Sequence, residues 1–290
     1  MSISRQNLSI VIVTIRSEKV VHDCLKSIDQ DIPTIVVDHS KNYDFKRELE
    51  SRYKNLKCIL SESNLGMGSG NNIGIKNSNT EHVLILNPDI ILKKNTIEEL
   101  ILASKKINNF TILAPLEENF INYGMFNRKN KPKIKNDEPF TVDYVDGFAM
   151  LINKKKIKSN NYFDENFFMY LENNDLCKRI IDNNGTIYVV PKSKIKHLAA
   201  KAVDDKFYDE VEFSRNWHWI WSKFYFNKKH FGFFTAFYKG LPKYFSSIFK
   251  FLFYFIVNNK IKKKIYFNRA SGFYNALIGK SSWYRPNLDD

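Results

Sequence analysis

The run Leu8-Ser-Ile-Val-Ile-Val-Thr14 decides the fold class, because a continuous apolar segment of this length predicts a strand covered on both faces. Similar runs lie at residues 34–38, 57–60 and 82–87. Segments with helical spacing of apolar residues fall between or after them, at residues 18–30, 45–53, 70–77 and 96–107. Repeated strand–helix pairs predict an α/β protein with a mostly parallel sheet flanked by helices.

Composition limits the class of protein. The chain has 290 residues and 43% of them are hydrophobic, which is enough to bury a core and excludes wholesale disorder. Its three cysteines are too few and too scattered for a disulfide framework or a cysteine zinc site, so a reducing compartment is expected. The first residues lack the charged and then apolar pattern of a secretory leader.

Charge and aromatic rings gather at the end of the chain. Residues 216–290 hold 13 Lys and Arg against only Asp289 and Asp290, within a total net charge of +14. They also hold 24 aromatic residues, including all four Trp. This shift predicts a first domain at residues 1–215 and a basic, aromatic helical segment at residues 216–290.

The tail favours contact with a membrane surface. Residues 231–238 and 245–257 are too apolar for a solvated nucleic-acid groove and too short to span a bilayer. Flanking lysines suit anionic headgroups. Helices that pack on the main domain with a solvated lysine face, and nucleic-acid binding, are the alternatives. Just before these runs, Trp217, His218, Trp219 and Trp221 either line an acceptor groove or pack in a core.

Three polar features follow the predicted strands. They are Asp38, the glycine-rich loop at residues 64–72, and Asp89 after Asn87-Pro88. Open α/β sheets bind ligands beyond the carboxyl ends of their strands, so the features converge on one crevice that suits a nucleotide. Taken alone, the loop has no Walker or dinucleotide spacing and is equally a plain turn. Asp89 alone is either a ligand for a hard cation such as Mg²⁺, a turn acid or a helix cap.

Residues 163–179 read Phe-Asp-Glu-Asn-Phe-Phe-Met-Tyr-Leu-Glu-Asn-Asn-Asp-Leu-Cys-Lys-Arg. Glu172 and Asp175 are three residues apart and share one helical face, and Arg179 is placed to pair with Asp175. A carboxylate in such apolar surroundings has a raised pKa and can act as a base. The alternative is a capped helix start with a salt bridge.

Together these motifs resemble the family 2 inverting glycosyltransferases of the GT-A fold, within them the rhamnosyltransferase-like branch. The resemblance covers residues 8–223. It rests on LSIVIVT, IVVDHS, NLGMGSGNNIGI, LNPDI, VDGFAMLI, FDENFFMYLENNDLCKR and IKHLAA, which occur in the family's order and spacing.

The resemblance implies a role for each matching position. Donor-binding positions are Thr14, Asp38, Asn64, Gly66, Asn72 and Asn87, with Asp146 and Gly147 near the donor sugar and the acceptor. Asp89 and His197 are the implied ligands of a divalent metal, Mg²⁺ or Mn²⁺.

One position departs from the family pattern, which places Asp where this chain has Asn173. Asparagine cannot usefully accept a proton at neutral pH. Either Glu172 serves as the base, which we expect from its longer side chain, or Asp175 does, or the protein is inactive.

The expected function is metal-dependent transfer of a hexose from a nucleoside diphosphate sugar, dTDP- or UDP-linked. The branch suggests rhamnose, and the acceptor is a hydroxyl of a cell-envelope glycan or lipid-linked molecule. The expected location is the cytoplasm, at the inner face of the cell membrane, with no nucleic-acid partner. The alternative is an inactive sugar-nucleotide-binding or scaffolding protein of an envelope glycan assembly.

Overall fold

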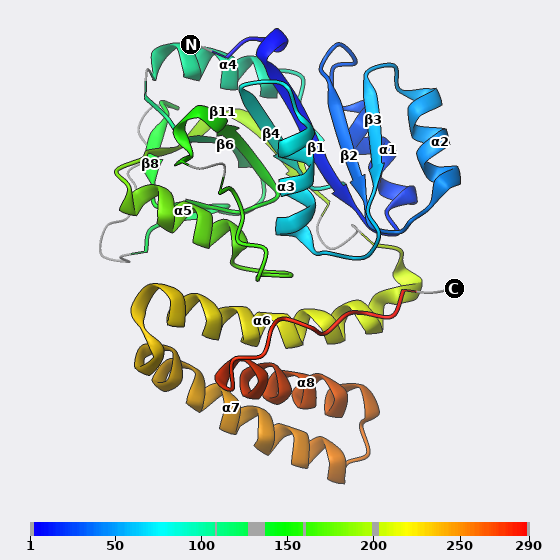
Figure 1. Ribbon diagram of the computed structural model, residues 1–290, viewed down its shortest axis with the longest axis vertical. Helices are drawn as coiled ribbons and strands as arrows, with labels where there is room; N and C mark the ends of the chain where they lie inside the picture. Colours follow the sequence, from blue (N-terminus) through cyan, green and yellow to red (C-terminus); the bar gives the residue numbers. More distant parts are fainter. Residues whose placement is uncertain (1–2, 108, 127–136, 159–160, 199–202, 289–290) are drawn as a thin grey trace. The chain divides into compact units, whose positions relative to one another are not determined.

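The computed structural model describes residues 3–107, 109–126, 137–158, 161–198 and 203–288 (Figure 1). The chain forms two compact units. The first unit comprises Met1–Asp164 and Asn173–Val203, and the second comprises Glu165–Glu172 and Asp204–Asp290. The short piece Glu165–Glu172 therefore belongs with the C-terminal residues rather than with the residues that flank it.

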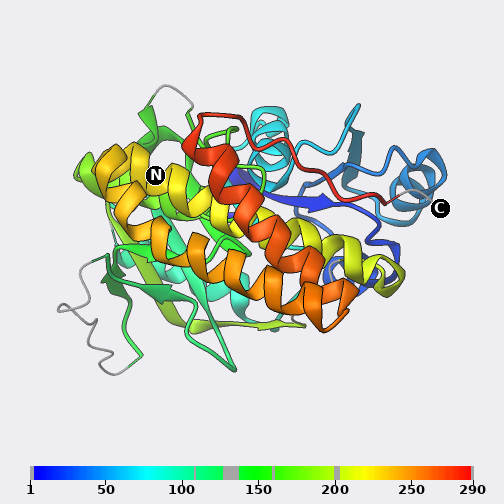
Figure 2. The same cartoon turned by 90° about the horizontal axis from the view of Figure 1, so that it is seen from below.

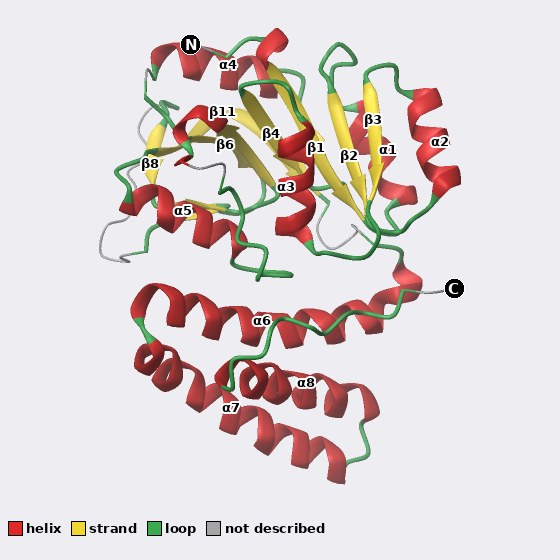
Figure 3. Cartoon of the chain, viewed as in Figure 1, coloured by secondary structure: helices red, strands yellow, loops and turns green. Residues whose placement is uncertain are grey.

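The first unit is built on one nine-stranded sheet, with strand order β3-β2-β1-β4-β10-β6-β11-β5 and β8 paired to β11 (Figure 3). Strands β3, β2, β1 and β4 are parallel. Strand β10 is antiparallel to β4 and β6, and β11 is parallel to β6, so β6 and β11 point in the same direction as β1. The sheet strands are β1 (Leu8–Thr14), β2 (Thr34–Asp38), β3 (Leu56–Leu60), β4 (His82–Leu86), β5 (Ile90–Leu92), β6 (Ile112–Glu117), β8 (Phe140–Val142), β10 (Ala149–Asn153) and β11 (Ile187–His197); β7 (Tyr123–Gly124) and β9 (Tyr144–Val145) form a separate pair.

Helices cover both faces of this sheet. Along β1, Ile10 and Ile12 join a core cluster with α1, α2 and α4, while Val11 and Val13 join a second cluster with α3 and α5. Alternate side chains of a strand point to opposite faces, so both sets are buried and the predicted two-sided strand is confirmed. The helices are α1 (Glu18–Lys26), α2 (Tyr43–Arg52), α3 (Met67–Asn77), α4 (Thr96–Lys106) and α5 (Glu172–Asp182).

The starts of α2 and α3 differ from the predicted ones for local reasons. Helix α2 begins at Tyr43, two residues early, because the Asn42 side chain accepts hydrogen bonds from the N–H groups of Asp44 and Phe45. Helix α3 begins at Met67 rather than at residue 70, since Gly66 supplies the positive φ of 84° at its N-cap. Helix α4 begins at Thr96, as predicted, directly after its N-cap residue Asn95.

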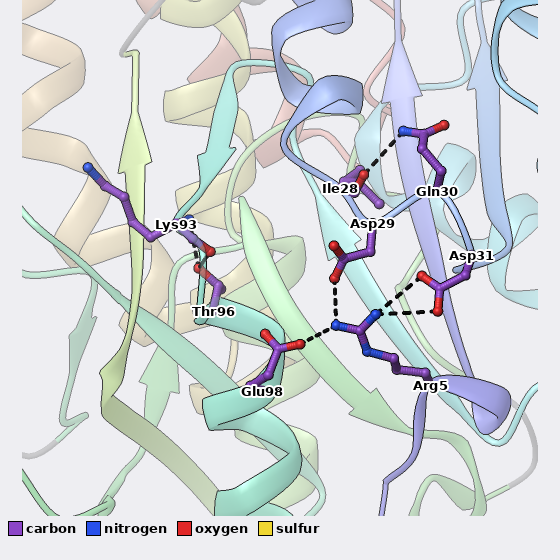
Figure 4. A network of polar contacts seen from close by, with 8 residues as sticks. All are labelled: Arg5, Ile28, Asp29, Gln30, Asp31, Lys93, Thr96 and Glu98. Carbon is purple, nitrogen blue, oxygen red and sulfur yellow. Dashed lines mark hydrogen bonds and ion pairs between the residues drawn. The ribbon is translucent and has the colours of Figure 1, made fainter.

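Arg5 joins three separate parts of the first unit (Figure 4). Its guanidinium lies 2.9 Å from Asp29 and 3.3 Å from Asp31, both after α1, and also pairs with Glu98 in α4. The Thr96 hydroxyl accepts the Lys93 N–H at 2.8 Å beside the start of the same helix. Because the Arg5 side chain is 41% exposed, we expect each of its ion pairs to contribute about 0–1 kcal/mol.

The second unit is a bundle of three long helices, α6 (Tyr208–Phe231), α7 (Phe233–Ile256) and α8 (Lys260–Leu277), which lie side by side (Figure 2). Its core is aromatic and includes Trp217, Trp221 and Phe273. Helix α7 is continuous through Pro242, where the sequence predicts two shorter apolar runs. No helix of the described ranges is long and apolar enough to cross a membrane.

The predicted domain boundary between residues 215 and 216 lies inside α6, so it does not separate the compact units. The structure divides the chain at Val203 and Asp204, and adds Glu165–Glu172 to the second unit. The composition misplaces the boundary because α6 begins with acidic residues, Asp209 and Glu210, and becomes aromatic and basic only further along the same helix.

Gly272 sets the distance between α8 and α6. A Cβ at this position would lie 2.4 Å from the main-chain oxygen of Trp217. Alanine has a helix propensity about 1 kcal/mol better than glycine, but here the two helix backbones would have to separate. We expect Gly272→Ala to destabilise the second unit by about 2 kcal/mol, with the exposed Ser281→Ala as the neutral control. Because every tryptophan lies in this unit, urea unfolding followed by tryptophan fluorescence measures it, and an unchanged midpoint would contradict the close contact.

Candidate functional site

Thr14 and Asp38 end neighbouring strands at the carboxyl edge of the sheet. They face each other in the β1–β2 register, and the Thr14 hydroxyl donates to Asp38 Oδ1 at 3.0 Å. Burial raises the pKa of the Asp38 carboxyl, while the Thr14 hydroxyl and the Ser40 N–H act in the opposite direction. A buried acceptor at a strand end suits the donor N–H or hydroxyl groups of a nucleoside.

The glycine-rich loop is fixed by a residue that the sequence analysis missed. His39 is buried, with Nδ1 at 2.5 Å from Ser61 Oγ and Nε2 at 3.2 Å from the Gly66 carbonyl. The Gly66 N–H in turn donates to Asn64 Oδ1 at 3.2 Å. Burial lowers the pKa of His39, so the ring remains neutral. Its hydrogen bonds connect the end of β2 to the glycine-rich loop. Its position directly after Asp38 is the signal that could have revealed it.

Asn72, a predicted donor-binding residue, contacts the main chain. Its Nδ2 donates to the Phe163 carbonyl at 2.8 Å, and its Oδ1 accepts the Phe163 N–H at 3.0 Å. Both ends of the buried amide are therefore used by one residue of the main chain. The contact links α3 to the chain just before Glu165–Glu172.

Asp89 and His197 come together although they are far apart in the sequence. Asp89 Oδ2 lies 3.3 Å from His197 Nε2, and Asp89 is almost fully buried. His197 is the last residue of β11, where it pairs with Ile90 of β5. Its ring packs on Phe148, with 4.6 Å between centroids.

Three buried atoms of this pair and of the nearby Asn87 are available to a ligand. Asp89 Oδ1, Asn87 Oδ1 and His197 Nδ1 are buried and have no hydrogen-bond partner. Within the described ranges, no group of three or more acidic, histidine or cysteine side chains is placed to hold a metal. Mg²⁺ is usually held by one or two carboxylates, together with water and substrate phosphates, so a two-residue protein site is compatible with it.

Glu117 is a further residue of this edge that the sequence analysis missed. It ends β6, and its carboxylate accepts the N–H groups of Phe120 at 2.8 Å and His197 at 3.3 Å. Burial acts to raise the pKa of Glu117. The hydrogen bonds from the N–H groups of Phe120, His197 and Asn119 outweigh burial and hold this pKa below its usual range. Glu117 thus fixes the end of β11. An apolar run that ends in an acid, as at Asp38, was the available signal.

Asp146 and Gly147 lie at the start of β10, on the same edge of the sheet. Asp146 is half-buried, its N–H donates to the Asn122 carbonyl at 2.8 Å, and burial raises its pKa while His197 opposes this. A Cβ on Gly147 would lie 3.1 Å from Asn173 Cβ. This glycine therefore allows the first turn of α5 to approach the strand.

Asn173 and Asp175 have structural partners. Asn173 Nδ2 donates to the Val145 carbonyl at 2.8 Å. Asp175 is fully buried and pairs with Arg179 Nε at 2.9 Å, the pairing that the sequence predicts. The Arg179 guanidinium also donates to the Asn161 carbonyl at 2.7 Å. These contacts favour a structural role for Asp175 over the role of base.

Glu172, by contrast, has a buried carboxylate oxygen, Oε2, without a hydrogen-bond partner. Burial raises the pKa of this carboxyl to about 7. The two preceding residues, Tyr170 and Leu171, adopt φ values of +69° and +68°, which cost about 1–3 kcal/mol each for residues other than glycine. Such strain is retained where the surroundings fix the backbone, and it concentrates at functional sites.

The surroundings that fix this backbone lie within the second unit. The Ser222 hydroxyl donates to the Met169 carbonyl at 2.7 Å, and the Ser282 hydroxyl donates to the Asn166 carbonyl at 2.7 Å. Phe168 lies between the His218 ring, at 4.5 Å, and the Arg285 guanidinium, at 3.9 Å. The helices and the last residues of the chain thus hold the segment that ends in Glu172.

Packing, rather than a groove, accounts for the residues clustered at the middle of α6. Trp217, His218 and Trp221 are buried, and only Trp219 is exposed, at 37%. His218 Nε2 donates to the Tyr284 carbonyl at 2.8 Å, and burial lowers its pKa to about 3, so it is neutral.

Comparison with known proteins gives relatives by sequence. The Low-salt glycan biosynthesis hexosyltransferase Agl10 of Haloferax volcanii is 28% identical over 198 residues, which are 60% of this chain and 61% of that protein. The Rhamnosyltransferase WbbL of Escherichia coli is 26% identical over 220 residues, which are 66% of this chain and 83% of that protein. The chain therefore matches less than two thirds of the length of the Haloferax protein.

Solved structures share the fold. The crystal structure of TarS 1-349 from S. aureus matches with a TM-score of 0.54 and 17% identity, over 98% of this chain and 94% of that one. The mannosyltransferase PcManGT from Pyrobaculum calidifontis, solved with GDP-Man and Mn²⁺, matches with a TM-score of 0.55 and 10% identity, over 94% of this chain and 73% of that one. These likenesses confirm the predicted GT-A fold.

The family itself follows from a direct match. The profile described as Glycosyl transferase family 2 matches residues 9–160, which run from β1 past β10 and include Asp38, the glycine-rich loop and Asp89. Since this is more than half of the sequence, the chain belongs to glycosyl transferase family 2.

Proposed function

We propose that this chain transfers a sugar from a nucleoside diphosphate sugar to a hydroxyl of an acceptor, with inversion at the anomeric carbon. The observation that carries the proposal is the meeting of Asp89 and His197 at the carboxyl edge of the sheet, with buried atoms left unpartnered. Family membership supports it, and so do the hexosyltransferase and rhamnosyltransferase relatives.

In the proposed reaction, the Glu172 carboxylate removes the proton from the acceptor hydroxyl while the oxygen of that hydroxyl attacks the anomeric carbon. The bond from that carbon to the diphosphate breaks on the opposite side, and the electron pair leaves with the diphosphate. Asp38 and the Asn64–Gly66 turn bind the nucleoside, while Asp146 and Gly147 border the sugar. A divalent cation held by Asp89 and His197 would supply positive charge to the leaving diphosphate.

The finer assignments rest on the resemblance and on the relatives. The proposed donor is a dTDP- or UDP-linked hexose, with rhamnose suggested by the Escherichia coli relative. The proposed acceptor is a cell-envelope glycan or a lipid-linked molecule, and the proposed location is the inner face of the cell membrane. A GDP-linked donor is the contrasting choice, because one structural neighbour was solved with GDP-Man.

Transfer assays with a panel of sugar nucleotides plus Mn²⁺ test this function. We expect release of nucleoside diphosphate from one donor class, and loss of that release when EDTA removes the metal. Full activity in EDTA would exclude the metal role.

The alternative, an inactive sugar-nucleotide-binding or scaffolding protein, is favoured by one observation, namely that Asn173 stands where the family has its base. Thermal shift with the same panel separates the two proposals. A ligand at 100 times its Kd should stabilise the fold by about 2.7 kcal/mol. Stabilisation without turnover by any donor would support the binding protein.

A further inference from the structure

Helix α7 has a second apolar face. Helix α7 packs on α6 and α8 (Figure 2). Ala236 and Ser247 mark its packed face, because both are buried. The opposite face presents large apolar side chains that are between 53% and 80% exposed. They recur at intervals of three, four or seven residues and so form one stripe along the helix, which we call the α7 stripe: Phe234, Tyr238, Phe245, Phe249, Leu252 and Ile256.

A stripe of this kind requires a partner. Single exposed apolar residues are ordinary, but a continuous row along a 24-residue helix forms the kind of patch that marks interaction with a protein or a membrane. Spanning is excluded for α7, since Lys239, Lys243 and Lys250 interrupt its sequence and its other face is packed within the bundle.

The charges of α7 and α8 identify the partner. The α7 lysines lie off the stripe and toward the packed side, where Lys239 donates to Asn227 Oδ1 at 3.2 Å and Lys250 lies 5.2 Å from the Tyr266 ring centroid. Lys239, Lys243 and Lys250 of α7 are exposed, as are Lys260 and Lys262 at the start of α8. Neither α7 nor α8 contains an acidic residue. Two copies of these helices, which carry only basic charges, would repel each other, whereas anionic lipid headgroups would neutralise the charges. An apolar stripe on one side of a helix, with lysines on the other side, is the pattern of a helix that lies in the membrane interface.

We propose that α7 lies in the plane of an anionic lipid leaflet, with the α7 stripe inserted among the acyl chains and the lysines at the headgroups. This surface would confine the chain to the place where lipid-linked acceptors reside. The inference does not depend on sugar transfer, because it concerns binding alone.

Point variants test the surface better than a deletion of the tail, because Ser282 and Arg285 hold the segment before Glu172. The full chain would be sedimented with vesicles of equal phosphatidylglycerol and phosphatidylcholine, and with vesicles of phosphatidylcholine alone. We expect wild type to bind the anionic vesicles, with affinity that falls as salt is added.

Two sets of variants separate the apolar and the charged contributions. Phe245→Ser with Phe249→Ser should weaken binding roughly a hundredfold, as expected for two buried rings. Lys239→Gln, Lys243→Gln and Lys250→Gln together should weaken binding to the anionic vesicles by a similar factor of roughly one hundred, at about fivefold per lysine. Tyr43→Ser is the matched control, since Tyr43 is 71% exposed on α2 in the first unit.

Circular dichroism and thermal shift with a sugar nucleotide show whether each variant is folded. Wild type that fails to bind anionic vesicles overturns the proposal, as does serine variant binding equal to that of wild type. Two further results overturn it in favour of another partner. One is a wild-type dimer that becomes a monomer in the serine variant, while neither protein binds vesicles. The other is salt-sensitive binding to single-stranded DNA without binding to vesicles.

Discussion

Glu172→Gln should lower kcat by roughly 10²–10⁴-fold, the contribution of a positioned general base, while the KM for the donor changes little. Glutamine keeps the length and shape of the side chain but cannot accept the acceptor's proton. Because a protonated carboxyl group is equally unable to do so, wild-type kcat should fall as the pH drops below about 7, the pKa to which burial raises Glu172. The variant's residual rate should lack this dependence, which initial rates across a pH series will show.

The same substitution should not destabilise the fold. A carboxyl whose pKa is raised in the folded state binds its proton more tightly there than in the unfolded chain, so its contribution to stability is present at low pH and is lost as the pH rises through about 7. At pH above 7 the glutamine variant should therefore melt at the same temperature as wild type or higher. Glu165→Gln makes the same change at an exposed position of the same segment, and should retain activity. Near-normal turnover by Glu172→Gln would exclude Glu172 as the base.

Asp89→Asn should lower kcat/KM by roughly 10²–10³-fold, the usual effect of removing one preorganised charge-stabilising group. Asparagine has the same shape but no negative charge, so it should hold a divalent cation poorly beside His197. Mn²⁺ titration by electron paramagnetic resonance, with nucleoside diphosphate present, measures the loss directly and needs no turnover.

Glu118→Gln provides the control for Asp89→Asn. Glu118 lies on the surface, where it pairs with Lys93 at 2.9 Å, and its loss should leave Mn²⁺ affinity unchanged. If Asp89→Asn bound Mn²⁺ as tightly as wild type, the proposed metal site would be wrong even if activity fell. If Mn²⁺ affinity and activity fell together, the metal and the reaction would be linked through this carboxylate.

Local pattern predicts the strands and helices of the first unit well, because burial on both faces leaves continuous apolar runs such as Leu8–Thr14. The approach of Asp89 to His197 follows from the order of motifs. The hydrogen bonds between the Asn72 amide and the Phe163 main chain could not be predicted in this way. The two residues are 91 positions apart, and no sequence pattern around either one indicates the other. Glu117 escaped notice because the strand that it ends was not recognised.

The division of the chain was the hardest feature to predict. Composition marks where residues become basic and aromatic, but compactness depends on contacts such as Ser222 with Met169 and Ser282 with Asn166. The latter pair is separated by 116 residues, and no periodicity carries such information.

The contacts of Ser282 and Arg285 with the segment before Glu172 have a consequence for how the protein folds during synthesis. Ser282 and Arg285 hold Asn166 and Phe168, and Ser282 is translated 116 residues after Asn166. While the ribosome is still adding α8, Ser282 and Arg285 have not been made. The Asn166 carbonyl and the Phe168 ring, in the segment that ends in Glu172, therefore lack these two partners. Maturation of the site therefore waits for the synthesis of Ser282 and Arg285, and a chain truncated before them can fold its sheet without acquiring a correctly held Glu172.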